Sequence, residues 1–346
     1  MADSLAQAFA SNAVLFPHML ELISDRILMS HLTEENFNTA SFLDQRMFTP
    51  QLKRNLLEWS DVENIPLPSA PTPYYIFHIG HVGSTLISRL LGEWSNILAL
   101  REPLILRNLA EIWQTLDAPH SRWSPEQYAA RRDLITRWLS RSFHDEQRPM
   151  VKASSFVSPL APQLIKSDTK ALFLKTNLES YMLTILAGEA SMHETMAMAP
   201  ARLERLTATL NEPPARLWEL TPAQRVAMSW LCEMVTLHRA EKTAPTGSVK
   251  WQDFDRFLAM PNAQLTEIAE FFDLSVEQPL VSALLQGPIM RSYSKAPEHG
   301  YSADLRRDVQ NEAKMRHGGE LKTAMKWVEK LANRHSAIAD ICNFNP

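Results

Sequence analysis

The sequence contains very little cysteine and no long apolar run, and these absences exclude several classes of protein. Its 346 residues include two cysteines, Cys232 and Cys342, whose separation matches no metal-ligand spacing. We therefore expect reduced thiols in a cytoplasmic protein, and no metal bound by cysteine. No stretch of about 18 apolar residues occurs, so no membrane-spanning helix is expected.

An excess of charge of one sign is also missing. The 35 basic and 39 acidic side chains leave a formal net charge of −4. So small a net charge creates no overall field that would attract nucleic acid or an anionic membrane, and any anion site must be local. The first residues lack a basic region and include Asp3, which is not typical of a secretory signal.

Short apolar runs that alternate with helical patterns are the main feature present. Strands are predicted at 74–79, 97–100, 150–153, 171–174 and 248–251. Helical spacing of apolar residues separates most of them, at 104–116, 125–143, 178–187 and 261–272. This alternation predicts an α/β fold whose largely parallel sheet is covered on both faces.

Two regions depart from this alternation. Residues 1–66 carry apolar residues at helical spacing, which predicts a helical N-terminal segment packed on the core. The proline-rich stretch 65–73 then forces an extended entry, so we divide the chain into 1–70 and an α/β domain at 71–346. Residues 188–243 predict a helical insertion rich in methionine, either simply packed or serving as a lid or acceptor-binding surface.

A glycine-containing turn joins the first predicted strand of the α/β domain to its helix. It is formed by Gly80, His81, Val82, Gly83, Ser84 and Thr85. The two glycines permit backbone conformations closed to other residues and a close approach to a ligand. The amides and dipole at the helix start favour a negative group, and two hydroxyls add donors. The turn therefore predicts a phosphate site; the alternative is a tight turn in which Ser84 caps its helix.

The lysine of the Walker pattern is absent from this turn. That pattern places a lysine before the hydroxyl residue to reach the β- and γ-phosphates, whereas Gly83 is followed directly by Ser84. A nucleoside triphosphatase would lose its main charge clamp here. A divergent kinase or nucleotide hydrolase stays open, with His81 and Lys175 as partial replacements.

The segment FHIGHVGSTLISRLLG resembles the 5′-phosphosulfate-binding loop of the sulfotransferases. In that family the loop reads proline, a basic residue, then Ser-Gly-Thr-Thr. Gly80 stands in place of the proline, and His81 in place of the basic residue that contacts the transferring group.

Later segments resemble further family elements in the expected order. Glu102, in Leu-Arg-Glu-Pro after the second strand, matches a glutamate that serves as catalytic base in tyrosylprotein-type and many bacterial members. Lys175 takes the place of the arginine of the 3′-phosphate element, and Thr184 is the closest hydroxyl to its serine. Residues 249–254 resemble the family's Tyr-Glu-Asp-Leu strand. Arg291 and Lys295 lie in the counterpart of its late basic loop, or else in an exposed polar loop.

The resemblance covers roughly residues 74–275. It implies a P-loop NTPase-like three-layer fold and sulfuryl transfer from 3′-phosphoadenosine 5′-phosphosulfate (PAPS), without a metal, to a hydroxyl or amine. The acceptor would be a small molecule or a peptide. The alternatives are the divergent kinase or hydrolase, or a nucleotide- or partner-binding protein without catalysis.

The order of the strands supports one common site. Ligands of open parallel sheets bind beyond the carboxyl ends of the strands. The Gly80–Thr85 turn, Glu102, Lys152 and Lys175 each follow a predicted strand, so all should reach one edge.

Three residues are candidates for catalysis. Glu102 would be the general base, or else form a salt bridge with Arg101 or Arg107, or a helix N-cap interaction beside Pro103. Lys152 would stabilise charge on the bridging oxygen, or else face water at a strand end. A protonated His81 would replace the missing basic side chain, or else be a silent loop histidine.

Overall fold

The computed structural model describes residues 8–9, 12–291 and 302–344. Its central sheet has five parallel strands in the order β5-β6-β4-β7-β8. These are β4 (Tyr74–His78), β5 (Ile97–Arg101), β6 (Arg148–Lys152), β7 (Ala171–Lys175) and β8 (Val249–Asp253). Every residue of β4, β5 and β7 is buried, as expected of strands covered on both faces. The predicted α/β fold with a central parallel sheet is confirmed.

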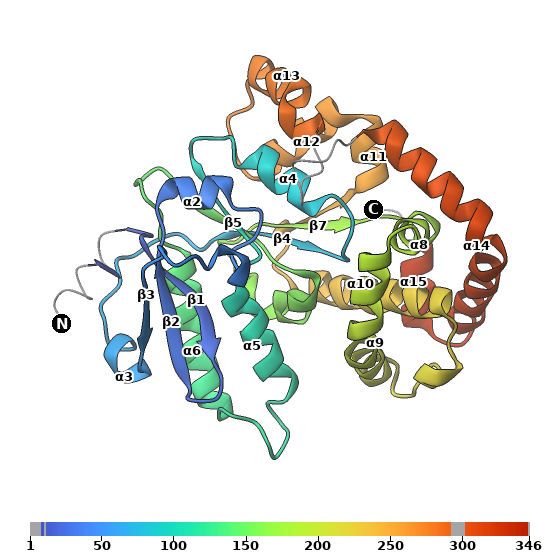
Figure 1. The fold of residues 1–346 in the computed structure, drawn as a ribbon, viewed down its shortest axis with the longest axis horizontal. Coiled ribbons are helices and arrows are strands. Elements are labelled where there is room, and N and C mark those ends of the chain that lie inside the picture. The colour runs from blue at the N-terminus through green and yellow to red at the C-terminus, as the bar shows by residue number, and fades with distance from the viewer. Residues whose placement is uncertain (1–7, 10–11, 292–301, 345–346) are drawn as a thin grey trace.

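Helices cover both faces of this sheet, which gives the molecule three layers (Figure 1). On one side lie α4 (Ser84–Leu91), α11 (Phe254–Ala259), α12 (Pro261–Phe271) and α13 (Gln278–Gln286). On the other lie α5 (Leu104–Gln114), α6 (Pro125–Leu139) and α10 (Pro222–Thr243). The remaining helices are α7 (Ala161–Leu164), α8 (Leu178–Leu186), α9 (Glu189–Leu210), α14 (Ala303–Ala332) and α15 (Ser336–Asn343).

Sequence signals account for where the long helices begin. Ser124 accepts a hydrogen bond from the amide of Gln127 at the start of α6, and Gln127 bonds back to Ser124. Thr221 and Gln224 repeat this capping box at the start of α10. A proline occupies the first turn of each helix, where its missing N–H removes no intrahelical bond.

The strand order places one turn at a special position. From β4 the chain runs to β5 and β6 on one side, and then crosses over to β7 and β8 on the other. The carboxyl end of β4 is therefore the topological switch point, where open α/β sheets bind their ligands. The turn that follows β4 is the one formed by Gly80 to Thr85.

The prediction of a helical N-terminal segment was wrong. The segment forms a three-stranded antiparallel sheet from β1 (Leu15–Glu21), β2 (Arg26–His31) and β3 (Arg54–Leu57). Two short helices accompany it, α2 (Glu34–Thr39) and α3 (Trp59–Val62). Asp25, with a φ of 53°, takes part in the turn that brings β1 and β2 together. Strand pairing and burial of Leu15, Ile27 and Met29 thus override an apolar spacing that also suits a helix.

The N-terminal segment is fastened to the edge of the central sheet by Arg101, the last residue of β5. Its Nη1 donates to the carbonyls of Phe37 at 2.9 Å, Asn38 at 3.3 Å and Ala40 at 2.9 Å. Burial lowers the pKa of this guanidinium to about 10, so it keeps its charge at neutral pH. Through these bonds the C-terminal end of α2 is held beside the carboxyl end of β5.

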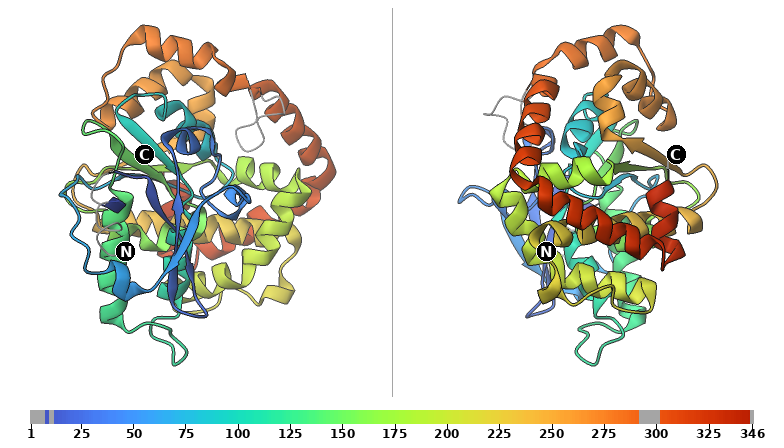
Figure 2. Two further views of the ribbon diagram at one scale, coloured as in Figure 1. Left: turned by 60° about the vertical axis from the view of Figure 1, so that its left-hand side comes forward. Right: turned by 90° about the vertical axis from the view of Figure 1, so that its right-hand side faces the viewer.

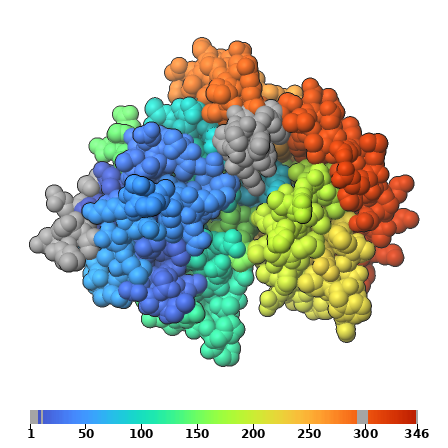
Figure 3. Space-filling view, viewed as in Figure 1, coloured from blue at the N-terminus to red at the C-terminus, as the bar shows by residue number. Residues whose placement is uncertain are grey.

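The insertion folds as two long helices, as its composition predicts. Helices α9 and α10 pack against one another, joined through the short η3 turn (Leu217–Glu219). Figure 2 shows the molecule from two further sides, and Figure 3 shows the N-terminal segment and the α9 region on opposite sides of one face. None of the helices in the described part of the chain combines the length and apolar character needed to cross a membrane.

Candidate active site

The turn after β4 has an unusual backbone. Gly80 and Gly83 have φ angles of 90° and 65°, and His81 between them has 55°. Gly83 is the N-cap of α4, and no side chain caps this helix, so the alternative in which Ser84 caps it is wrong. The amide of Ile87 bonds to the carbonyl of Gly83 at 3.0 Å. The amides of Ser84 to Leu86 precede this first helical bond and are therefore available to an anion.

A buried hydroxyl group lies at the start of the same helix. Thr85 is 3% exposed, and its Oγ1 has no hydrogen-bond partner among the described residues. A buried hydroxyl without a partner is costly, and a bound oxyanion would accept its hydrogen bond. The turn therefore fits the phosphate group that its sequence predicts.

Phe254 closes the turn on the side of β8. Asp253 caps α11, since its Oδ1 accepts from the amides of Asp255 at 2.9 Å and Arg256 at 3.1 Å. This cap fixes Phe254 at the first position of the helix, with its ring against Gly83. A Cβ atom at position 83 would lie 1.9 Å from Phe254 Cε2, so only glycine fits.

A cavity of about 410 Å³ lies on the other side of the turn. It gathers residues from the turn, from the ends of β5 and β6, and from α8 and α9. The lining includes Gly80, His81, Glu102, Ser154, Ser155, Tyr181 and Arg202. The structure thus brings Glu102 and His81 together beside the turn, as the strand-end argument expects.

Glu102 forms an ion pair with Lys152 inside the protein. The Lys152 side chain is 0% exposed, whereas that of Glu102 is 19% exposed and reaches the cavity. A second bond, from the Glu102 amide to the Lys152 carbonyl at 2.6 Å, holds the two strand ends together. Glu102 has a φ of 51°, a strained conformation for a residue with a side chain, which the surrounding bonds maintain.

The alternatives for these two residues do not occur. Arg101 donates to backbone carbonyls, and Arg107 pairs with Glu111 at 3.3 Å instead of with Glu102. Lys152 does not face water, because the end of β6 is covered.

His81 lies between the turn and α9. Its Nε2 is 3.5 Å from Glu194 Oε2, and its Nδ1 is 3.4 Å from Ser191 Oγ. The imidazole of His81 therefore lies between a hydroxyl and a carboxylate of α9, at the edge of the cavity.

Tyr181 and Arg202 are among the cavity residues that were not predicted from the sequence. Tyr181 on α8 is buried, and burial raises the pKa of its hydroxyl to about 12, so it stays neutral. Arg202 on α9 is 7% exposed and donates to Glu233 Oε1 at 3.0 Å. A signal for Arg202 exists in the sequence, because it stands in a helical stripe whose other members are small or apolar. The buried residues of that stripe are Thr195, Ala199, Arg202 and Leu206.

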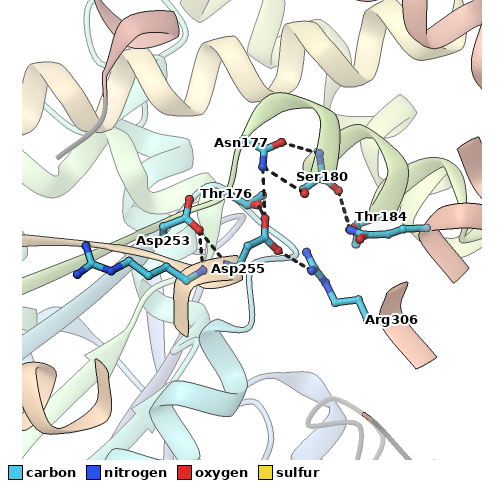
Figure 4. A network of polar contacts seen from close by, with 9 residues as sticks. Thr176, Asn177, Ser180, Thr184, Asp253, Asp255 and Arg306 are labelled. Carbon is cyan, nitrogen blue, oxygen red and sulfur yellow. Dashed lines mark hydrogen bonds and ion pairs between the residues drawn. The ribbon is translucent and has the colours of Figure 1, made fainter. Parts of the chain in front are cut away.

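A polar network lies beyond the turn on the side of β7 and β8 (Figure 4). Asp255 accepts from Thr176 Oγ1 and from Arg306 Nη1, each at 2.5 Å. Thr184 Oγ1 donates to the Ser180 carbonyl at 2.8 Å and accepts from Gln310 at 3.0 Å. Arg306 and Gln310, both from α14, were also missed, because nothing in the sequence links this late helix to β7.

The structure places Lys175 apart from the Gly80–Thr85 turn. Its Nζ donates to the Phe344 carbonyl at 3.0 Å, and it lines a second cavity of about 590 Å³ beside α14 and α15. Burial lowers the pKa of its ammonium group. The following residue, Thr176, faces Asp255 instead.

The late basic loop lies partly outside the described residues. Arg291 ends the short η4 turn (Pro288–Arg291) and is exposed. Lys295 is not among the described residues.

Comparisons with known proteins give similarity of structure only. No family model matches the chain, and no curated protein matches it. Among solved structures, a sulfotransferase domain from the curacin biosynthetic pathway matches 72% of this chain and 99% of its own, at 11% identity and a TM-score of 0.42. A mouse sulfotransferase complexed with PAP matches 80% and 90%, at 8% identity and a TM-score of 0.41.

A third match, from Alicyclobacillus acidocaldarius, covers 76% of this chain and 96% of its own, at 14% identity and a TM-score of 0.40. It too is a sulfotransferase. The P-loop-like architecture of the present chain is evident from its own strand order and from the turn after β4.

Proposed function

We propose that the protein is a sulfotransferase that moves a sulfuryl group from PAPS to a hydroxyl or amine. One observation carries this proposal: the turn at the switch point, through Gly80 and His81, lines the same cavity as the carboxylate of Glu102. The turn supplies a site for the donor, and the carboxylate supplies a base for the acceptor.

The turn fits the phosphosulfate end of the donor. The amides at the start of α4 and Thr85 Oγ1 would hold its oxygens, and no lysine of the Walker type is needed for this contact. When bound, the donor supplies the sulfuryl group and a nucleotide leaving group. His81 lies at the mouth of the turn, where a protonated imidazole would stabilise negative charge.

Glu102 would accept the proton of the acceptor, a role that typically accelerates a reaction by about 10²–10⁴-fold. Lys152, proposed from sequence to stabilise charge on the bridging oxygen, acts here through Glu102. The buried ammonium group holds the carboxylate at the cavity wall. Lys152 is therefore a positioning residue in this proposal.

The far side of the turn offers groups for the 3′-phosphate of the donor. Arg306 Nη2 is buried without a hydrogen-bond partner among the described residues, while Nη1 is held by Asp255. Thr184 lies in the same network. We propose that Arg306, together with Thr184, contacts the 3′-phosphate, and that Lys175 is the weaker candidate.

Ligand-dependent stability tests the function. Adenosine 3′,5′-bisphosphate in the presence of a metal chelator should raise the melting temperature. At a concentration of 100 times Kd the expected stabilisation is about 2.7 kcal/mol. Stabilisation by Mg-ATP alone would favour a kinase or hydrolase, and stabilisation by neither nucleotide would favour a protein without catalysis. Transfer of labelled sulfate from PAPS then confirms the reaction.

A further inference from the structure

We infer that Arg202 binds a carboxylate of the acceptor, so that the substrate is a small acid that also carries the reacting hydroxyl or amine. This inference rests on the proposed function and names the class of molecule that occupies the cavity. A cavity of about 410 Å³ has the size of a small-molecule site.

The position of Arg202 is unusual for a charged residue. It comes from the middle of α9, is 7% exposed, and lines the same cavity as Glu102. A guanidinium group in a cavity wall has lost most of its hydration, which is costly unless a partner compensates it. One partner is Glu233, and Ser155 Oγ lies 3.4 Å from Nη2.

The cluster behind Arg202 carries more positive than negative charge. Glu233, 1% exposed, accepts from Arg202 at 3.0 Å and from Arg205 at 2.7 Å. Cys232, the other partner of Arg205, adds no negative charge at neutral pH because burial raises the pKa of its thiol. Two guanidinium groups thus share one carboxylate, and one positive charge is left over.

The other charges of the cavity wall have counter-charges. The pairs are Arg46 with Asp44, Lys152 with Glu102, and Arg107 with Glu111, while the carboxylate of Glu194, beside His81, is 58% exposed and therefore screened by water. The excess positive charge of the cavity therefore belongs to the Arg202 cluster, which favours an anion beside it.

The geometry around Arg202 suits a carboxylate. A guanidinium presents five N–H donors in a plane, and it commonly binds the two oxygens of a carboxylate together. Ser154 also lines the cavity, and its Oγ is buried without a hydrogen-bond partner among the described residues. A carboxylate beside Arg202 would accept hydrogen bonds from the hydroxyls of Ser154 and Ser155. Glu102 would then be left for the reacting end of the molecule.

The contribution of α9 to the cavity is polar except for one alanine. It consists of Ala190, Ser191, Glu194, Thr195 and Arg202. The methionines of the insertion do not appear in the described lining, so they give no reason to expect an apolar acceptor.

Binding of simple acids and their neutral counterparts tests this inference. The probes are 4-hydroxybenzoate, benzoate and acetate, with 4-hydroxybenzyl alcohol as the neutral match of the first. We expect wild-type protein to bind 4-hydroxybenzoate more tightly than the alcohol in calorimetry. Arg202→Gln should weaken binding of the acid by about tenfold or more, as expected for hydrogen bonds to a charged group, and leave the alcohol unchanged.

Arg205→Gln is the matched control. It removes the same charge from the same cluster, but Arg205 does not line the cavity as described. In each single variant Glu233 keeps one arginine, so both proteins should fold, which circular dichroism checks. Arg205→Gln should weaken the acid less than Arg202→Gln does. Equal losses of affinity for the acid in the two variants would overturn the inference. It would also be overturned if the wild type bound none of the three acids more tightly than it binds chloride.

Titration of the same proteins with adenosine 3′,5′-bisphosphate separates this inference from the proposed function. Arg202→Gln should bind the nucleotide as the wild type does. A wild type that prefers the acid but does not bind the nucleotide would retain the carboxylate site and reject the sulfotransferase. A wild type that binds the nucleotide but does not prefer the acid to the alcohol would retain the nucleotide site of the proposed sulfotransferase and reject the carboxylate site.

Discussion

The ring of Phe254 occupies the space that a side chain on Gly83 would need. Phe254 Cε2 lies 1.9 Å from the position of a Cβ at residue 83, and Gly83 also has a φ of 65°. Glycine is thus required for two separate reasons, backbone conformation and space. The contact couples the shape of the turn to the cap that begins α11 at the end of β8.

Gly83→Ala should destabilise the protein and weaken nucleotide binding. The left-handed φ costs about 1–2 kcal/mol for a residue with a Cβ. Overpacking against Phe254 adds about 1–3 kcal/mol. Denaturant unfolding measures the loss of stability, and calorimetry with adenosine 3′,5′-bisphosphate measures the loss of affinity. Gly247→Ala is the control, because Gly247 has a φ of 77° but nothing lies within 4 Å of its added Cβ. If both variants lose the same stability, the contact with Phe254 has no effect.

Glu102→Gln should lower the rate of sulfuryl transfer by about 10²–10⁴-fold and leave nucleotide affinity nearly unchanged. The substitution also removes the carboxylate partner of buried Lys152, and breaking a buried ion pair costs about 3–5 kcal/mol. Some of the lost activity could therefore reflect instability.

The double variant Glu102→Gln with Lys152→Met separates the two effects. Removing the ammonium group as well should restore part of the stability, but not the rate. Recovery of both stability and turnover would exclude Glu102 as the general base.

Arg306→Ala should weaken binding of adenosine 3′,5′-bisphosphate about tenfold or more, with a smaller effect on adenosine 5′-phosphate. The reason is that a charged hydrogen bond to the 3′-phosphate is lost in the first complex only. Lys175→Ala should affect the two nucleotides equally, because Lys175 bonds to the Phe344 carbonyl. If Lys175→Ala lost the preference for the bisphosphate over adenosine 5′-phosphate and Arg306→Ala kept it, the 3′-phosphate contact would belong to Lys175 and not to Arg306.

His18 should make the protein less stable in mild acid. This residue of β1 is 0% exposed, and burial lowers its pKa below the usual value of about 6.5. As pH falls below about 6.5 the unfolded chain takes up a proton that the folded chain resists, so unfolding becomes more favourable. Above that pH the imidazole is neutral in both states.

His18→Phe should flatten this pH dependence, since Phe16 and Phe48 already surround the ring. Unfolding curves of the wild type and of His18→Phe at pH 5 to 8 give the difference in their free energies of unfolding. This difference reports on His18, because the two proteins share every other titrating group. Parallel curves over this range would contradict the buried state of His18.

The strands, the helices and the anion-binding turn of the α/β domain could be predicted because each depends on local pattern. Five short apolar runs and a glycine-containing turn suffice to place Gly80, Gly83 and Glu102 at one sheet edge. The N-terminal sheet could not be predicted, since its strands are selected by pairing between distant segments such as Leu15 and His31.

The partners within the site were also beyond the sequence. The pairing of Glu102 with Lys152 depends on two neighbouring strands whose order is fixed only by the whole sheet. Arg306 reaches the network of Asp255 from a helix that begins about fifty residues later.

Calorimetric titration with adenosine 3′,5′-bisphosphate in EDTA, compared with adenosine 3′-phosphate, tests the central claim most directly. The claim is that the turn from Gly80 to Thr85 holds the 5′ end of the donor. The bisphosphate should bind, removal of its 5′-phosphate should weaken binding strongly, and Gly83→Ala should abolish the difference. Equal affinity for the two nucleotides, or binding of Mg-ATP alone, would contradict the claim.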